Sequence, residues 1–410
     1  NALTIVTEFI GIVLALDYLG VSKELGVAAS AVLIMAAVST GNFRRFERFS
    51  MVLVFGSLLL VPIFLMVHPP YGDIARDLVV PQLPQGGKLS EVMLLIIAIV
   101  GTTIAPWQLF FQQSYIIDKR ITPRFMRYER IDLWLGIVLV IIGGVAMMAF
   151  AAATFAGQAG FGNFTDAAGV ARGLEVHSGR IAGVLFAIAL IDASLIGASA
   201  VSLSTAYAIG DVFSIKHSLH RKPSEAKGFY IVYCALIVIA AVLVLTPGVP
   251  LGLLTNAVQT LAGVLLPSAT VFLLLLCNDK EVLGPWANGR KANLFTGAVI
   301  AVLVMLSIIL TASVMFPDQT NEAVILSILG GGSLLTIMAA FFAGVFKPTK
   351  KDAAPVTVWN RDVWRMPPLE KLRPLELSTA SKLWMLALRG YLMIAGGLVI
   401  AKIAMLVVSA

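Results

Sequence analysis

The sequence has little charge. Only 13% of its 410 residues are charged, whereas 59% are hydrophobic, and the mean hydropathy is +0.91. A soluble domain contains about a quarter charged residues and about half apolar residues. The composition therefore excludes a water-soluble enzyme and predicts a membrane protein.

Cysteine and histidine are also scarce. The two cysteines, Cys234 and Cys277, lie in or at the end of apolar runs, which gives neither a disulfide framework nor a metal-binding spacing. The four histidines all fall in predicted loops without the spacing of metal ligands, and we interpret them as solvated surface residues. They are His68, His177, His217 and His220. Redox chemistry therefore has no support in the sequence.

Apolar runs dominate the sequence instead. A membrane-spanning helix needs about 20 apolar residues, and runs of this kind are far longer than the alternating strands of a membrane barrel. We therefore predict an all-α membrane protein with about eleven transmembrane helices. The predicted spans are residues 1–21, 26–41, 48–67, 89–115, 131–156, 181–213, 229–247, 252–277, 292–316, 322–346 and 383–408.

The net charge is +7, and the distribution of Lys and Arg along the chain indicates how the protein is oriented in the membrane. Of the 30 Lys and Arg residues, 23 lie in alternate loops, at 42–48, 116–130, 214–228, 278–291 and 347–384. The positive-inside rule makes these loops cytoplasmic. We predict a multi-pass protein of the cell (inner) membrane, with residue 1 on the cytoplasmic side and the C-terminus outside. The basic residues then face anionic lipid, and nucleic acid is not an expected partner.

The chain has three predicted parts. Residues 1–346 form a membrane-spanning core, residues 347–382 a charged, proline-rich cytoplasmic linker, and residues 383–410 a peripheral transmembrane helix. Residues 68–88 and 157–180 are predicted to be extracytoplasmic loops. Asn1 directly precedes an apolar run without a charged leader, so we expect the N-terminus to be incomplete, with an even number of preceding spans.

The most informative stretch lies within the run 89–115, from Gly101 to Gln108. Pro106 has no amide proton, so the carbonyl of Thr102 loses its helical hydrogen bond. Together with Gly101 and two threonines, this predicts a helix that unwinds within the membrane and exposes carbonyl oxygens, which bind hard cations. A simple proline kink satisfied by neighbouring helices is an equal alternative.

Four segments in register resemble the NRAMP family of divalent-metal transporters. Thr103–Gln108 resembles the family's sixth helix, whose pattern at Ala105 to Gln108 is Met-Pro-His-Asn. In the family's tenth helix, a glutamine eight residues before a proline faces the ion, and Gln259 and Pro267 match this spacing. The tenth-helix match continues to its exit at 278–284. The other two segments, 44–47 and 185–190, resemble the start of the fifth helix and the eighth helix. The resemblance covers residues 3–316.

The resemblance implies a LeuT-like fold built on an inverted repeat. In this register the first span corresponds to the family's third helix, so its first two helices, with their Asp-Pro-Gly-Asn motif, are expected to be missing. The implied metal site comprises Thr102, Ala105 and Gln259, with Gln108 as a holder of water. Pro106 and Trp107 are expected to shape the cavity.

The departures from the family pattern are equally informative. Ala105 replaces a methionine thioether, a soft ligand that favours manganese and iron, and an all-oxygen site suits Mg²⁺. Trp107 replaces a histidine, and Ala15 and Tyr18 stand where the family has an acidic pair for proton movement. This pattern resembles the NRAMP-related magnesium transporters. The alternative is that alanine at position 105 reflects neutral packing drift.

Two acidic residues, Glu8 and Asp192, also lie inside predicted spans. Glu8 fits a cytoplasmic vestibule, whereas Asp192 is either a structural hydrogen-bonding group or a secondary attractor of cations. These features predict transport of Mg²⁺, with Mn²⁺ as a second candidate, by alternating access without proton coupling. The expected partners are the divalent cation and the lipid bilayer, without a cofactor or an obligatory protein partner. The alternatives are proton-coupled Mn²⁺ or Fe²⁺ transport, a membrane-embedded enzyme, and a non-transporting receptor or scaffold.

Overall fold

The computed structural model describes residues 1–80, 89–155, 166–248, 251–316, 319–345 and 364–368, together with 386, 388–394, 396–397 and 401. The secondary structure within these residues is helical, without strands. Apart from 364–368, the predicted linker at 347–382 lies outside the described residues. The predicted last span is described only in part, as helix at 388–394.

The described residues divide into two compact units. The first contains residues 1–80, 110–155, 166–248 and 251–258, and the second contains residues 89–109, 259–316 and 319–345. The helices of the first unit are α1 (Ala2–Leu19), α2 (Lys23–Val38), α3 (Phe43–Gly56), α4 (Leu60–Val67), α5 (Tyr71–Val79), α8 (Met126–Phe155), α9 (Ala167–Ser178), α10 (Arg180–Val212) and α11 (Lys227–Val244). The 3₁₀ turn η1 (Ser57–Leu59) joins α3 to α4, and η2 (Pro123–Phe125) precedes α8.

The second unit contains α6 (Leu89–Thr103), α13 (Lys280–Leu283), the 3₁₀ turn η3 (Gly284–Trp286), α14 (Arg290–Met315) and α15 (Glu322–Val345). Two further helices, α7 (Pro106–Asp118) and α12 (Leu251–Cys277), belong partly to each unit, with the division after Leu109 and after Val258.

Eight helices of the described part of the chain are long and apolar enough to cross a membrane. The remaining three predicted spans have separate explanations. Residues 26–41 correspond to α2, which has only 16 residues, and residues 322–346 correspond to α15, of which Glu322–Met338 is a shorter apolar stretch. Most of residues 383–408 lies outside the described residues.

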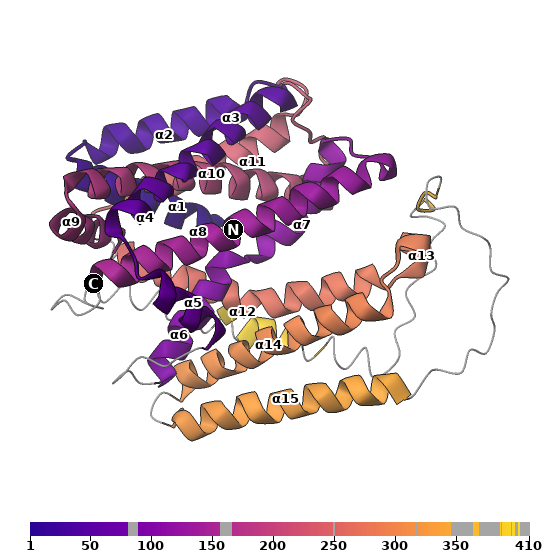
Figure 1. The fold of residues 1–410 in the computed structure, drawn as a ribbon. Helices are drawn as coiled ribbons and strands as arrows, with labels where there is room; N and C mark the ends of the chain where they lie inside the picture. Colours follow the sequence, from indigo (N-terminus) through magenta and orange to yellow (C-terminus); the bar gives the residue numbers. More distant parts are fainter. Residues whose placement is uncertain are drawn as a thin grey trace. The chain divides into compact units, whose positions relative to one another are not determined.

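The first unit is organised around α10, which packs against α1, α3, α9 and α11. In Figure 1, the indigo helices α2 and α3 lie alongside α10 and α11. Helices α1 and α10 are antiparallel, because Asn1 Nδ2 donates to Thr205 Oγ1 at 2.9 Å near one end, whereas Gly183 approaches Tyr18 near the other. This pairing agrees with opposite membrane crossings for the two spans.

The segments predicted as loops at 68–88 and 157–180 contain helices, which corrects that prediction. Helix α5 lies in the first, and α9 lies in the second, where Asp166 accepts a hydrogen bond from the amide of Gly169 at 2.9 Å. Leu174 of α9 is fully buried in a cluster with Ile63 and Phe150. Short, glycine-containing helices lack the long apolar run on which the prediction relied, so tertiary packing decides their structure.

The close packing of α10 against α9 generates a testable prediction. A Cβ atom at Gly183 would lie 2.8 Å from the carbonyl oxygen of Ala171 and would also collide with the hydroxyl of Tyr18. We expect Gly183→Ala to destabilise the protein by about 1–3 kcal/mol, the usual cost of overpacking. Thermal unfolding in detergent measures this effect.

The matched control is Gly136→Ala in α8, where a new Cβ would meet no atom within 4 Å. Alanine is favoured over glycine inside a helix by about 1 kcal/mol, so this variant should melt at or above the wild-type temperature. Equal melting temperatures for wild type, Gly183→Ala and Gly136→Ala would contradict the predicted close contact.

Candidate cation site

The predicted unwinding lies between α6 and α7. Helix α6 ends at Thr103 and α7 begins at Pro106, which leaves Ile104 and Ala105 outside either helix. The amide of Ile104 still donates to the carbonyl of Val100 at 3.1 Å. Because Pro106 has no amide, the carbonyl of Thr102 has no donor four residues ahead. This carbonyl is therefore free of the α-helical ladder.

The side chain of Gln108 stabilises the break. Its Oε1 accepts a hydrogen bond from the backbone amide of Ala105 at 3.1 Å. The backbone amide of Gln108 donates to the carbonyl of Ala105, also at 3.1 Å. This arrangement is the glutamine half of a capping box, with proline at the first helical position. The sequence predicted a holder of water at Gln108, and the structure gives its oxygen a capping role that proline followed two residues later by glutamine could have revealed.

The residues of the break differ in exposure. Ala105 is 5% exposed, whereas Thr102 and Thr103 are exposed and Pro106 and Trp107 are half-buried. The hydroxyl of Thr103 donates to the carbonyl of Ile99, one turn back in α6, at 2.7 Å. A small, buried side chain thus lies beside a backbone carbonyl released by proline.

Helix α12 contributes the other predicted ligand, the half-buried Gln259, and has its own proline, Pro267. Pro267 releases the carbonyl of Gly263 in the same way that Pro106 releases that of Thr102. The hydroxyl of Ser307 in α14 lies 3.5 Å from this carbonyl. The helix itself continues through Pro267, so α12 is not interrupted as α6 and α7 are.

Two glycines bring the break and α12 together within the second unit. A Cβ atom at Gly101 would collide with the carbonyl oxygen of Gln259 and would lie 2.6 Å from the backbone nitrogen of Gly263. A Cβ atom at Gly263 would lie 3.0 Å from the carbonyl oxygen of Ile97. Backbone therefore packs directly on backbone, and Gln259 lies beside the turn of helix that carries Thr102.

The described residues contain no group of three or more His, Cys, Asp or Glu side chains arranged to hold a metal ion. The groups that the structure brings together where α6 meets α12 are instead backbone atoms, among them the neutral carbonyl oxygen of Gln259 beside Gly101. Neutral oxygens accept hydrogen bonds or bind hard cations without taking up a proton in the neutral pH range. The arrangement can therefore replace part of the water shell of a cation.

The two intramembrane acids belong to the first unit. The carboxyl group of Glu8 in α1 packs against Gly197 of α10, and that of Asp192 packs against Gly56 at the end of α3. Oδ2 of Asp192 is buried without a hydrogen-bond partner in the described part of the chain. The structure thus places both acids at helix contacts, and neither lies in the unit that holds Thr102 and Gln259.

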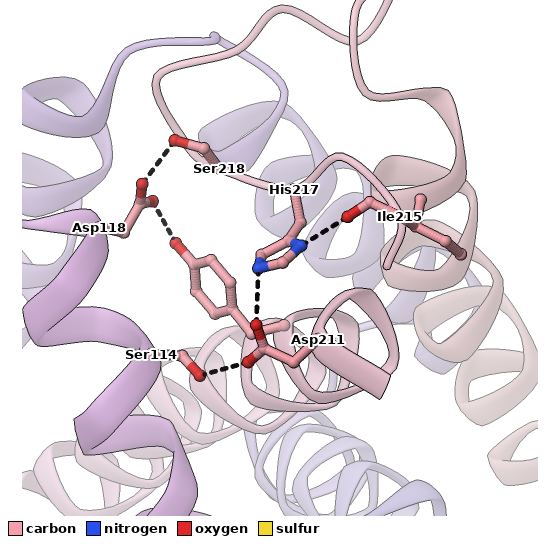
Figure 2. A network of polar contacts seen from close by, with 7 residues as sticks. Ser114, Asp118, Asp211, Ile215, His217 and Ser218 are labelled. Atoms are coloured by element: carbon pink, nitrogen blue, oxygen red, sulfur yellow. Dashed lines mark hydrogen bonds and ion pairs between the residues drawn. The ribbon is translucent and has the colours of Figure 1, made fainter. Parts of the chain in front are cut away.

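A polar network that the sequence did not reveal joins the ends of α7 and α10 to the segment after α10, as Figure 2 shows. His217 is half-buried there, which corrects its interpretation as a solvated surface residue, whereas His220 is exposed, as that interpretation expects. Nε2 of His217 pairs with Asp211 at 3.0 Å, and Nε2 of His220 lies 3.1 Å from the carbonyl oxygen of Asp118. No sequence motif marks these contacts, because their partners come from separate helices.

The crossing of α6 and α12 generates a second prediction. We expect Gly101→Ala to force the two backbones apart, to destabilise the protein by about 1–3 kcal/mol and to weaken cation binding. Thermal unfolding and isothermal titration with a divalent cation measure the two effects. Gly297→Ala in α14 is the control, because a Cβ there would meet no atom within 4 Å. Tight binding by Gly101→Ala would show that Gly101 does not position the ligands.

Comparison with known proteins identifies the family. The sequence profile described as "Natural resistance-associated macrophage protein-like" (Nramp) matches residues 1–313. The "Divalent metal cation transporter MntH" of Ralstonia nicotianae is 28% identical over 311 residues, which cover 72% of this chain and 68% of that protein. The protein of the same name from Pectobacterium carotovorum subsp. carotovorum is 24% identical over 332 residues, covering 76% and 73% of the two chains. The chain belongs to the Nramp family, whose members are membrane transporters of the LeuT fold and not enzymes.

Proposed function

We propose that this chain transports divalent metal cations by alternating access, with Mg²⁺ as the preferred ion, and that transport is not coupled to protons. Transport of a divalent metal cation is supported by membership of the Nramp family and by the names of the two MntH relatives. The cation is the transported substrate. The inner membrane, with residue 1 on the cytoplasmic side, is the proposed location, because basic residues alternate between the loops.

The preference for Mg²⁺ rests chiefly on Ala105. This residue lies at the break between α6 and α7 and is 5% exposed, and the family places a methionine at the corresponding position. A thioether is a soft ligand that suits later transition metals. Mg²⁺ prefers oxygen ligands and retains several waters when it binds. Alanine removes the sulfur and leaves space for water.

The proposed ligands are the carbonyl oxygen of Thr102 and the side-chain oxygen of Gln259. Their helices contact each other at Gly101 and Gly263, and Pro106 prevents the carbonyl of Thr102 from entering the helical ladder. Trp107 gives the cavity a bulky wall, and Gln108 fixes the geometry of the break through its bond to Ala105. Each role follows from a contact or a chemical property of the second unit.

The first test of this proposal is Ala105→Met. We expect the ratio of Mn²⁺ to Mg²⁺ uptake in proteoliposomes to rise about tenfold, which corresponds to about 1.4 kcal/mol, because methionine supplies a soft ligand and displaces water. Ala105→Leu is the matched control, since it adds comparable volume without sulfur. An unchanged ratio in a transport-competent Ala105→Met protein would contradict a site beside position 105.

The absence of proton coupling rests on three substitutions relative to the family pattern. Ala15 is buried, and the hydroxyl of Tyr18 donates to Glu175 at 2.8 Å, so neither side chain offers a carboxylate at these positions. Trp107 does not accept a proton where the family has histidine. The proposed driving force is the gradient of the cation and the membrane potential, which contributes about 2.3 kcal/mol per charge for each 100 mV.

The second test uses proteoliposomes that contain a pH-sensitive dye. We expect Mg²⁺ uptake without acidification of the lumen, because the described spans contain no chain of titrating groups leading from the break. Acidification in proportion to Mg²⁺ uptake, abolished by Glu8→Gln, would instead overturn the uncoupled mechanism and favour proton coupling, as in the alternative of proton-coupled Mn²⁺ or Fe²⁺ transport. A complete lack of cation flux with any of these ions would favour a receptor or scaffold.

A further inference from the structure

The last residue of α7, Asp118, is the centre of a dense set of hydrogen bonds in the first unit. Its carboxylate accepts from the hydroxyls of Tyr207 and Ser218, both at 2.5 Å, and from the amide of Leu219 at 2.8 Å. Three donors satisfy an ionised carboxylate well. Asp118 thus ties the end of α7 to α10 and to the segment that follows α10.

A second branch runs through Asp211, near the end of α10. Its Oδ2 accepts from the hydroxyl of Ser114 in α7 at 3.2 Å, and its Oδ1 lies 3.0 Å from Nε2 of His217. On the other side of the same ring, Nδ1 of His217 lies 2.6 Å from the carbonyl oxygen of Ile215. Figure 2 shows both nitrogens of this ring directed at oxygen atoms.

Both partners of His217 are hydrogen-bond acceptors, a carbonyl and a carboxylate. A neutral imidazole has one N–H donor and one acceptor nitrogen, so it satisfies only one of the two contacts. An imidazolium ion donates from both nitrogens and also pairs its charge with Asp211. A flip of the ring would place carbon atoms against both oxygens, so the two short contacts favour the nitrogen positions observed.

We propose that His217 is a proton-binding site, and that its protonated form latches the end of α7 to α10 through Asp211 and Ser114. The proton regulates the conformation and is not transported with the cation. When this proton is lost, the lone pair of one ring nitrogen faces an acceptor oxygen, and the two repel each other. The latch is therefore closed while the ring of His217 carries the second proton and opens when that proton is lost.

The surroundings of His217 support this assignment. The described ion pairs give it one carboxylate partner, Asp211. From α10, the ring of Tyr207 packs edge-on against the imidazole at 5.9 Å, and from α11 the uncharged ring of Phe229 lies at 6.4 Å. The hydroxyl of Tyr207 is directed to Asp118 of α7. The imidazole side chain is 25% exposed and the side chain of Asp211 is 58% exposed, so solvent reaches the pair mainly from the side of Asp211.

Other charged groups near the network either have their own partners or are exposed on the segment that follows α10. Lys119, next to Asp118, lies 3.9 Å from Glu47 of α3. The ring of His220 stacks on Phe43 at 5.3 Å, while its Nε2 faces the carbonyl of Asp118. The neighbouring bases Lys216 and Arg221 are on the same segment as His217. These cations disfavour a further positive charge on His217 through long-range repulsion. The direct attraction between His217 and Asp211 has to exceed that repulsion.

Because the latch holds one end of α7, it should affect transport, an inference that rests on the proposed function. Helix α7 starts at the break, where Ala105 and Gln108 are hydrogen-bonded, and it ends at Asp118. Alternating access requires rearrangement of helices around the site. A closed latch fixes one end of the helix that leaves the break, so protonation of His217 should slow transport.

Nitrogen NMR of the protein in nanodiscs, with ¹⁵N-labelled histidine, tests the protonation directly. The chain has four histidines, and His217→Gln assigns the signal of interest. We expect His217 to show the imidazolium signature at pH 6 and a neutral tautomer at pH 8, with His177 as an internal control outside the network. A neutral His217 at pH 6 in a folded protein would overturn the proposal.

Hydrogen exchange of residues 213–222, corrected for the intrinsic effect of pH, tests the latch itself. We expect wild-type protein to lose about tenfold in protection between pH 6 and pH 8, as expected when a charge-assisted hydrogen bond is lost. His217→Gln and Asp211→Asn should each remove this pH dependence, and Lys216→Gln should retain it. Wild-type pH dependence in both His217→Gln and Asp211→Asn would exclude the latch.

Mg²⁺ uptake into proteoliposomes at equal internal and external pH completes the test. Uptake by wild type should rise from pH 6 to pH 8, and uptake by His217→Gln should depend less on pH. If no variant transports Mg²⁺ while the NMR and exchange changes persist, the proposed function fails and the latch stands. If uptake is normal but the exchange of 213–222 is independent of pH, the latch fails and the proposed function stands.

Discussion

The absence of one amide proton, at Pro106, is the constraint on which the candidate site depends. Hydrocarbon offers no water to satisfy a released carbonyl, so an unwound turn persists in a membrane only where other groups replace the missing bonds. Here the side-chain oxygen of Gln108 provides an acceptor for the backbone amide of Ala105. The carbonyl of Thr102 is the group that the proline leaves for a ligand.

Close contact between helix backbones is the second element of the structure. Apolar side chains gain little from moving between lipid and protein, so helices in membranes associate through tight packing and small residues. Gly183 permits this approach in the first unit, and Gly101 and Gly263 permit it in the second. The same property that stabilises the helix pair therefore also sets the distance between the two candidate ligand segments.

The features that could be predicted from the sequence are those that depend on residues close together in the chain. Long apolar runs predict the spans, and Pro106 predicts the break, because helix length and the loss of a backbone donor are properties of neighbouring residues. The short helix α9 was missed because burial of Leu174 depends on Ile63 and Phe150, which are distant in the chain. Spacing alone does not identify such contacts.

The network around Asp118 illustrates the same limit for polar groups. Its partners Tyr207 and Leu219 are 89 and 101 positions away, so only the folded arrangement of α7 and α10 brings them together. The four family-like segments could be placed in register from the sequence, and they located Gln259 beside the break. The capping role of Gln108 is local by contrast, because a glutamine at the third helical position, two residues after Pro106, can bond the backbone amide that precedes the helix.

The 3₁₀ turn between α3 and α4 changes the rotational phase of the span that contains it. A 3₁₀ helix advances about 120° per residue in place of 100°, so the three residues of η1 rotate the following helix by about 60° and lengthen it by about 1.5 Å. Without this turn, Gly56 and Ile63, seven residues apart, would face within about 20° of each other. With the added rotation, Ile63 lies about 40° from Gly56 in the opposite sense. Ile63 packs in its cluster with Phe150 of α8, while Gly56 lies against Asp192 of α10, so one span contacts both neighbours.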